Sequence, residues 1–301
     1  MSGRAELMGF LLVDKPAGVT SHDVVAAARR AFAIRKIGHA GTLDPFATGL
    51  LVLGIGRATR LLDYLVGLDK EYEGTARLGV ATDSLDPEGA CVARDDRWRG
   101  IPADRIRSVA ASMEGPILQT PPQYSAVKVR GVPAHRRTRR GESVELAPRE
   151  VRVRRFEVLA TDLPEVRFFV ACSSGTYVRS LAAELGERLG TCCHLTALRR
   201  TRVGSFHLRD AAPVASVHAG ELPAHAWVEP RTALSHLGTV EVHPEEALLL
   251  AQGRRIPAGE TGADRAPSSG PVAFILPGGP LVAVGRIRNG LIEPGKVFLR
   301  V

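Results

Sequence analysis

The chain has 301 residues, of which 45% are hydrophobic, and it carries a formal net charge of +8 with a pI of about 9.8. This length can bury the core of one large domain with a small appendage, and the composition is that of an ordinary globular protein. Four cysteines without a paired C-x-x-C spacing exclude a secreted disulfide framework, and no uncharged stretch approaches the roughly twenty residues that a membrane helix needs. We therefore expect a cytoplasmic protein with free thiols, no membrane contact and no metal site.

The N-terminal segment predicts a strand followed by a helix. Residues 9–13 are apolar and typical of a buried strand, and residues 14–18 turn the chain into a helix that begins near Thr20 or Ser21 and runs to residue 32. Ser21 is the expected cap, because its hydroxyl can accept a hydrogen bond from the first turn.

A loop bounded by glycines comes next, over residues 37–49. It precedes an apolar run at 50–53 and a short helix around 58–66. Residues 71–80 then alternate, which is typical of a half-buried strand. The face expected to be buried carries Tyr72, Gly74, Ala76, Leu78 and Val80.

The middle of the chain alternates between helix and strand without a regular βαβ rhythm. A helix is expected near residues 103–113, a strand at 166–172, and a second helix that follows residues 173–176 and ends near 189. Such an order predicts a mixed sheet in an α+β domain.

Positive charge is concentrated in one stretch. Between Tyr124 and Arg155 there are ten Lys or Arg against three Glu, so this stretch holds +7 of the net +8. A solvated surface is the ordinary explanation for a basic run, but this concentration favours a surface that binds phosphates.

The last sixty or so residues differ in composition. After Glu241 a short helix is expected to end near Gly253, and residues 257–271 are rich in Gly, Ala, Ser and Pro. Two runs typical of strands follow at 272–276 and 281–287, so we expect a small β-rich C-terminal domain.

Asp44 is the strongest candidate for catalysis. It lies in the glycine-bounded loop, and Pro45 disfavours helical geometry at Asp44, so its carboxylate is held in a turn. An Asp-Pro turn with a purely structural aspartate is the competing interpretation. A carboxylate nucleophile needs a cationic partner where water is excluded, and Arg179, in the first turn of the predicted helix ending near residue 189, is a candidate for that partner.

Three further side chains suit the binding of a nucleic acid base. Tyr72 and Tyr177 could stack on a base, although core packing is the default for Tyr72. His39, five residues before Asp44, could stack on RNA or hydrogen-bond to it, or cap a turn, and spacing does not decide between these roles.

Residues 54–59 imitate a dinucleotide-binding turn. The imitation fails because Thr59 replaces the third glycine and no acidic residue ends a second strand about twenty residues on. A nucleotide-dependent oxidoreductase is therefore disfavoured.

Five motifs, taken in chain order, strongly resemble the TruB family of tRNA pseudouridine-55 synthases. The resemblance covers roughly residues 9–206, with a weaker match beyond. It implies the pseudouridine-synthase fold, in which a central mixed, mainly antiparallel sheet is flanked by helices and loops, over residues 1–236. It also implies a basic RNA-gripping insertion at about 121–155 and a C-terminal PUA-like RNA-binding domain over 237–301. The motifs are residues 14–21, 38–51, 70–79, 174–181 and 194–206.

The same resemblance implies that the protein isomerises uridine-55 in the T arm (TΨC loop) of tRNA to pseudouridine. It assigns Asp44 as the nucleophile, Arg179 as its partner, and a uridine pocket with His39, Tyr72, Tyr177 and Leu198. Because this reaction remakes a glycosidic linkage without a redox or phosphoryl-transfer step, no cofactor or metal is expected. The expected partner is tRNA, bound by a monomer without an obligate protein partner. A non-catalytic RNA-binding or tRNA-folding protein is the alternative, since a basic surface alone would serve it.

Overall fold

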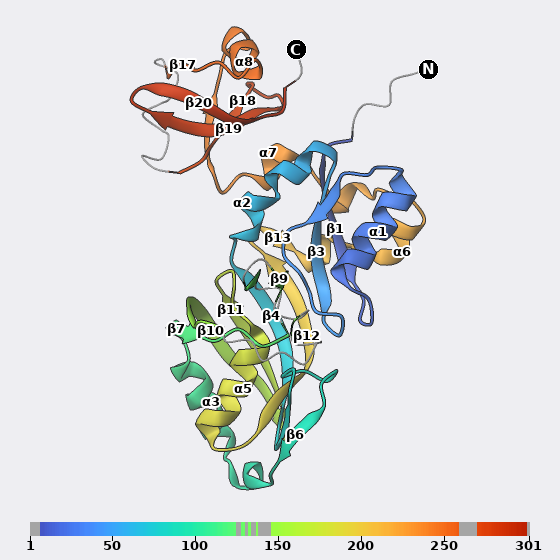
Figure 1. The fold of residues 1–301 in the computed structure, drawn as a ribbon, viewed down its shortest axis with the longest axis vertical. Helices are drawn as coiled ribbons and strands as arrows, with labels where there is room; N and C mark the ends of the chain where they lie inside the picture. Colours follow the sequence, from blue (N-terminus) through green and yellow to red (C-terminus); the bar gives the residue numbers. More distant parts are fainter. Residues whose placement is uncertain are drawn as a thin grey trace.

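The molecule is elongated, with the C-terminal sheet at one end and the large sheet running down its length (Figure 1). The computed structural model describes residues 7–124, 128–129, 132–133, 137, 146–258 and 270–299. Within these ranges the large sheet has 11 strands, in the order β14-β1-β3-β12-β4-β11-β10-β7, with β2, β13 and β15 pairing beside this path. Its strands are β1 (Gly9–Lys15), β2 (Ile37–His39), β3 (Thr48–Ile55), β4 (Lys70–Leu78), β7 (Gly115–Gln119), β10 (Arg149–Asp162), β11 (Glu165–Cys172), β12 (Cys193–Val203), β13 (Phe206–His207), β14 (Ala212–Pro213) and β15 (Trp227–Val228).

The sheet is mixed and mainly antiparallel, which confirms the predicted fold class. In the described chain only the β1–β14 and β3–β12 pairs of this sheet are parallel. The helices are α1 (Ser21–Phe32), α2 (Leu62–Val66), α3 (Ala103–Ser112), α5 (Val178–Leu189), α6 (Val214–His218), α7 (Pro230–Ala233) and α8 (Pro244–Ala251), and a 3-10 helix, η1 (Gly56–Leu61), precedes α2.

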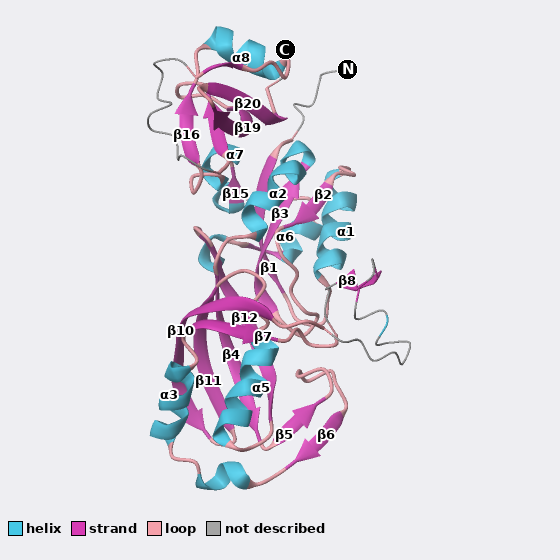
Figure 2. Cartoon of the chain, turned by 60° about the vertical axis from the view of Figure 1, so that its left-hand side comes forward, coloured by secondary structure: helices cyan, strands magenta, loops and turns pink. Residues whose placement is uncertain are grey.

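Two hydrophobic cores lie along the sheet. The first gathers β1, β3 and α1, and the second gathers β4, β11 and β12 with α3 and α5. Figure 2 shows α3 and α5 against the lower half of the sheet, while α1 and α6 lie against the upper half. Short helices suffice here because their stability comes from an apolar face packed on the sheet.

The start of α1 differs from the prediction. Thr20, not Ser21, is the N-cap, and it forms a capping box with Asp23. Ser21 is buried, and its hydroxyl both accepts from the Leu43 backbone N–H at 2.9 Å and donates to the Leu43 carbonyl at 3.1 Å. Ser21 therefore ties the first turn of α1 to the loop that carries Asp44.

Strand β4 shows the predicted alternation but is shorter than expected. Its even-numbered residues are buried as far as Leu78, which confirms the buried face up to that point. Val80 instead begins β5 (Val80–Thr82), which pairs with β6 (Cys91–Arg94) in a separate hairpin. Gly79 separates the two strands, because its φ of +82° takes the chain out of extended geometry.

The two halves of the large sheet meet at a narrow seam. Strand β3 pairs with β12 through two residue pairs, Thr48 with Arg199 and Gly49 with Arg200. A Cβ on Gly49 would lie 2.3 Å from the Arg200 carbonyl oxygen, so only glycine allows the strands to approach this closely. The loop before β3 contains Asp44, so the seam lies beside it.

The C-terminal region forms a second, five-stranded sheet, in the order β16-β18-β19-β20-β17. The predicted helix and two strand runs are confirmed as α8, β18 and β19, whereas the sequence did not predict β16, β17 or β20. Strand β20 contains Pro294 and Gly295, which weaken the strand pattern. The strands are β16 (Gly238–Glu241), β17 (Ile256–Pro257), β18 (Val272–Ile275), β19 (Leu281–Arg288) and β20 (Leu291–Val297).

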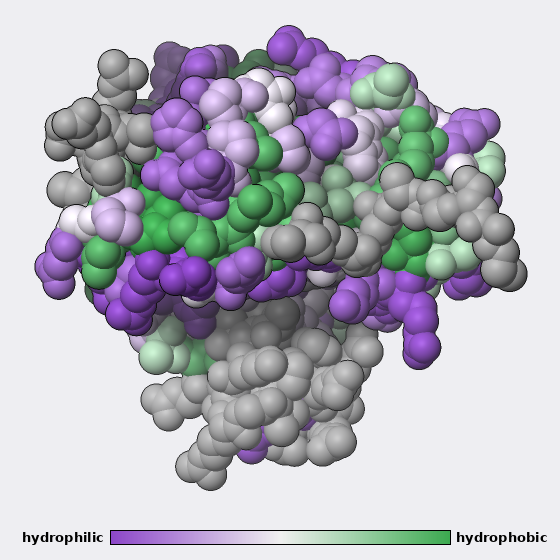
Figure 3. All heavy atoms as spheres, turned by 90° about the horizontal axis from the view of Figure 1, so that it is seen from above, coloured by the Kyte–Doolittle hydropathy of each residue, from purple (hydrophilic) through white to green (hydrophobic). Residues whose placement is uncertain are grey.

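The C-terminal sheet is docked firmly on the rest of the chain. Phe298, 4% exposed, belongs to the first core, and the guanidinium groups of Arg57 and Arg60 lie over its ring at 5.8 and 5.3 Å. Arg57 also donates to the carbonyls of Val297 and Phe298, at 2.9 Å each. Seen from above, a hydrophobic strip crosses a mostly hydrophilic surface (Figure 3).

Part of the predicted RNA-gripping insertion, at 125–127, 130–131, 134–136 and 138–145, lies outside the described residues. Elsewhere in the insertion, β8 (Lys128–Val129) pairs with β9 (Val132–Pro133). Across the described ranges, no helix is long and apolar enough to cross a membrane, and no three His, Cys, Asp or Glu side chains are grouped to hold a metal ion.

The glycines of the imitated dinucleotide turn are explained by packing. A Cβ on Gly54 would lie 3.0 Å from a Leu62 methyl group, and one on Gly56 would lie 2.2 Å from the Leu7 carbonyl oxygen. The turn leads into η1, a 3-10 helix, and not into a long helix whose N-terminus could receive a phosphate.

Candidate active site

A cavity of about 670 Å³ opens beside the seam of the large sheet, next to the loop between β2 and β3, here called the Asp44 loop (residues 40–47). The loop, strands β4 and β12, the start of α5 and residues 83–90 all contribute to its wall. Five of the predicted site residues line it, namely Asp44, Tyr72, Tyr177, Arg179 and Leu198. The structure therefore brings together side chains that are up to 154 positions apart, the interval from Asp44 to Leu198.

The Asp44 loop is held by a buried lysine. Lys15 is 0% exposed, and its ammonium group donates to the carbonyls of Pro16, Val19 and Pro45 at 2.8, 2.7 and 3.2 Å. The backbone N–H of Gly18 also donates to the Pro45 carbonyl. These contacts fix the backbone directly after Asp44, so its carboxylate has a defined direction.

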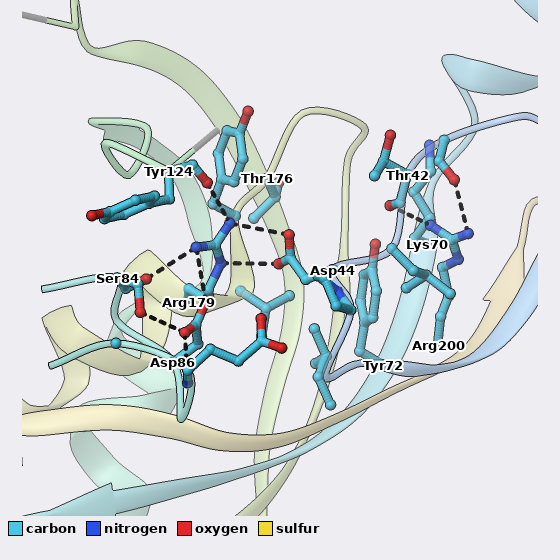
Figure 4. Close-up of a pocket in the computed structure, with 18 of the residues that line it drawn as sticks. Thr42, Asp44, Lys70, Tyr72, Ser84, Asp86, Tyr124, Thr176, Arg179 and Arg200 are labelled. Atoms are coloured by element: carbon cyan, nitrogen blue, oxygen red, sulfur yellow. Dashed lines mark hydrogen bonds and ion pairs between the residues drawn. The ribbon is translucent and has the colours of Figure 1, made fainter. Parts of the chain in front are cut away.

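Arg179 is shared between two carboxylates. Its Nε lies 2.9 Å from Oδ2 of Asp44 and its Nη2 lies 3.2 Å from Oδ1, so the two groups face each other in a fork (Figure 4). On its other side, Nη1 lies 3.1 Å from Oδ2 of Asp86 and donates to the Ser84 carbonyl. Such a bidentate pair fixes geometry as well as charge.

The burial of the two acids differs. The Asp86 side chain is 6% exposed and receives a hydrogen bond from the Ser84 hydroxyl, whereas the Asp44 side chain is 33% exposed. Asp86 thus serves to hold Arg179, and Asp44 presents an oxygen to the cavity.

Burial raises the pKa of the Asp44 carboxyl, since desolvation penalises the charged form. The neighbouring Arg179 is the main influence that lowers this pKa, and the negative charge of Asp86 raises it further. The guanidinium group is therefore what favours an anionic Asp44 at this site.

The aromatic and apolar wall of the cavity is built on β4, β12 and the start of α5. Tyr72 and Leu198 are each 8% exposed and lie on the neighbouring strands β4 and β12. Tyr177 precedes α5, and its backbone N–H and carbonyl are both bound by the side-chain amide of Gln119, at 2.7 and 3.1 Å. These contacts position the loop before α5 without using the tyrosine ring.

His39 is placed differently from the other predicted site residues. It lies at the end of β2, opposite Leu53, and does not line the cavity. Its Nδ1 is buried and has no hydrogen-bond partner among the described residues. Burial lowers the pKa of His39, with Arg200 and His22 adding to this effect and the Gly41 backbone opposing it, so the ring is neutral at pH 7.

Sequence reasoning missed several residues of the site. Asp86 and Ser84 lie in a polar segment without periodicity, so no pattern pointed to their contact with Arg179. Lys15, Lys70 and Arg200 lie inside the motifs that carried the family resemblance, but no sequence pattern indicated that they are buried. Arg200 is held by backbone carbonyls about 150 positions away, and Lys15 in part by the distant Pro45 carbonyl. Lys70 is held by the carbonyls of Val66 and Leu68, just before it in the chain.

Comparisons with known proteins identify the family. Residues 29–178 match the TruB family pseudouridylate synthase N-terminal domain, and residues 179–237 match the tRNA pseudouridylate synthase B C-terminal domain. A chain in the crystal structure of a Cbf5-Nop10-Gar1 complex superposes with a TM-score of 0.73 at 26% identity, covering 97% of this chain and 85% of that one. The fold and the matched domains define the class of protein as a pseudouridine synthase.

Two individual relatives narrow the assignment from the class of pseudouridine synthases to one family. The tRNA pseudouridine synthase B of Thermobifida fusca (strain YX) is 45% identical over 306 residues, which cover 96% of this chain and 98% of the relative. The protein of the same name from Opitutus terrae is 50% identical over 220 residues, covering 73% of this chain and 91% of the relative. The chain belongs to the TruB family.

Proposed function

We propose that the protein is a tRNA pseudouridine synthase that isomerises uridine-55 in the T arm of tRNA, with Asp44 as the nucleophile. The observation that carries this proposal is the Asp44 carboxylate, forked to Arg179 at 2.9 and 3.2 Å and partly exposed in a cavity lined by Tyr72, Tyr177 and Leu198. The names of the relatives support tRNA as the substrate.

In the proposed reaction the bond between uracil N1 and ribose C1′ breaks, and its electron pair stays on the ring. The ring turns, C5 bonds to C1′, C5 loses its proton, and N1 gains one, so the product has the atoms of the substrate. Asp44 can bond transiently to C1′ or to C6 of the ring, or accept a proton from the ribose. Each route needs an anionic oxygen at Asp44, which Arg179 favours.

The substrate base must leave its stack before it can enter the cavity. Unstacking costs on the order of a few kcal/mol, and stacking on an aromatic side chain returns roughly 1 to 3 kcal/mol. Tyr72, on β4, and Tyr177, before α5, are two of the three tyrosines that line the cavity in the described chain, so they can offset much of this cost. We assign His39 to a contact with RNA beside the cavity, because its neutral ring can stack there.

The catalytic domain in this proposal spans residues 1–236, and residues 237–301 form a PUA-like domain that binds the tRNA outside the T loop. The protein acts as a monomer in the cytoplasm, where its four unpaired cysteines would stay reduced. The basic stretch at 121–155 contributes contacts to phosphates.

Replacing Asp44 with Asn tests the proposal. Asp44→Asn removes the negative charge and keeps the size of the side chain, so release of tritium from C5-labelled uridine in a tRNA transcript should stop. Asp104→Asn, which alters an exposed acid of α3 paired with Arg107, is the matched control and should retain full activity. If Asp44→Asn still released tritium, Asp44 would not be the nucleophile; if the wild type bound tRNA and released none, the protein would be an RNA-binding or tRNA-folding protein.

A further inference from the structure

Two buried cations at the cavity have no part in the chemistry described above. Lys70, at the start of β4, is 7% exposed, and Arg200, on β12, is 1% exposed. Both line the cavity, and Arg200 lies directly opposite Tyr72 in the β4–β12 ladder. Burying a charge is costly, so its presence beside a cavity needs a physical reason.

Lys70 is hydrogen-bonded to neutral groups. Its ammonium group donates to the carbonyls of Val66 and Leu68, at 2.6 Å each. Over the described ranges it forms no ion pair with a carboxylate, in contrast to Arg179, which has two. Two carbonyls occupy two of the three N–H donors of an ammonium group, and neither carries a full negative charge to balance it.

Arg200 is bound in the same manner. Its Nε donates to the Leu50 carbonyl at 2.7 Å, while Nη1 and Nη2 donate to the carbonyls of Thr42 and Gly41 at 3.3 and 3.1 Å. No carboxylate of the described chain pairs with it. Its guanidinium group also interacts with the hydroxyl of Tyr72.

Gly41 lies beside both cations. A Cβ built on Gly41 would lie 3.6 Å from Nη1 of Arg200 and 3.9 Å from Cε of Lys70, and the φ of Gly41 is +101°. Gly41 itself lines the cavity. Figure 4 shows Lys70 and Arg200 beyond Tyr72, on the side away from Arg179. The cavity therefore has an ion pair at one side and, at the other, two positive charges that no described carboxylate pairs with.

Burial lowers the pKa of Lys70 to about 8, with the charge of Arg200 adding to the effect. Lys70 is therefore mostly protonated at pH 7, so its charge is available. The uracil ring gains negative charge in every route for the proposed reaction, because it leaves with the electron pair of the N1–C1′ bond or accepts electrons when C6 is attacked. Fixed positive charge aimed at a developing anion lowers the barrier.

We propose that Lys70 and Arg200 stabilise the negative charge that the uracil ring gains during the reaction, and so set how readily the base detaches. This inference rests on the proposed function. Neither residue supplies or accepts a proton in it; each acts by its charge, from the wall of the cavity beside Gly41.

A leaving-group test separates this role from a purely structural one. T-arm stem-loops carry either uridine or 5-fluorouridine at the target position, and the single-turnover loss of the target nucleoside is followed by digestion and chromatography. Fluorine withdraws electrons and stabilises the ring anion, so the fluorinated ring needs less help from the protein. The readout is the ratio of the two rates for each variant.

Lys70→Met should lower the rate with uridine by on the order of a hundredfold, as the loss of one group that stabilises a developing anion does in other enzymes. The loss with 5-fluorouridine should be at least tenfold smaller, and Lys70→Arg, which keeps the charge, should restore the wild-type ratio. Lys15→Met is the matched control, since Lys15 is a buried lysine that holds the Asp44 loop but does not line the cavity. It should slow both substrates equally.

An equal loss with both substrates in Lys70→Met would overturn the inference and leave Lys70 a structural residue. Should Lys70→Met fail to fold, the ratio for Lys70→Gln, which keeps a hydrogen-bonding group without charge, decides the question in the same way. Absence of any pseudouridine with the wild-type protein would instead contradict the proposed function, so the two failures are distinguishable.

Discussion

Removing Arg179 should destabilise the protein as well as inactivate it. The Arg179 side chain is 4% exposed and neutralises Asp86, whose side chain is 6% exposed. Arg179→Met therefore leaves Asp86 as a buried, unpaired carboxylate, which costs about 3 to 5 kcal/mol of unfolding free energy. It also removes the main group that lowers the pKa of Asp44, so kcat should fall on the order of a hundredfold.

Urea unfolding followed by circular dichroism measures the first effect, and tritium release from tRNA measures the second. The double variant Arg179→Met with Asp86→Asn removes the unpaired charge and should regain about 0.5 to 3 kcal/mol, the range expected for coupled neighbours. Its activity should remain low, because Asp44 still lacks its partner. Stability and activity should thus separate in the double variant.

Arg107→Met is the control for the loss of an arginine. Arg107 is 52% exposed and pairs with an exposed Asp104, so its removal should change stability by no more than about 0.5 kcal/mol. If Arg179→Met were no more destabilising than this control, the account of a buried carboxylate held by Arg179 would be refuted. A double variant that regained full activity would refute the role of Arg179 at Asp44.

Three further outcomes are expected. Because the pKa of Asp44 is raised above 3.8, kcat/KM should fall with decreasing pH at a midpoint above that value, and a pH profile with an acid limb at or below 3.8 would contradict the shift. The pKa of Lys70 is about 8 in the folded state, below its unfolded value of 10.5, so Lys70 makes the folded state more stable as pH rises from 8 to 10.5. Over this range, urea unfolding should show the unfolding free energy of the wild type rising by up to roughly 3 kcal/mol relative to that of Lys70→Met. A constant difference between the two proteins would disprove it. Gly49→Ala places a Cβ 2.3 Å from the Arg200 carbonyl oxygen at a φ of +101°. The seam should therefore open, and the unfolding free energy should fall by more than about 1 kcal/mol. Gly67→Ala is the control and should be tolerated, because a Cβ there would meet nothing within 4 Å.

Local sequence patterns determined much of the fold. The apolar run before Asp14 predicted β1, and the alternation after Lys70 predicted β4, because a strand exposes its two faces in turn. The order of strands and helices predicted a mixed sheet, and five short motifs identified the family and placed Asp44 in a glycine-bounded turn. These features depend on residues close together in the chain, so a reader of the sequence has all the information that they require.

The details of the site depend on tertiary structure. Asp86 contacts Arg179 across 93 positions, and Arg200 reaches the Thr42 carbonyl across 158, so no local pattern contains either contact. Sequence alone made Ser21 the helix cap and continued β4 to Val80; the Leu43 backbone claims the Ser21 hydroxyl, and the positive φ of Gly79 ends the strand. The chain thus specifies which groups are present, whereas the packing of distant segments decides which charges are buried, what compensates them, and which acid faces the cavity.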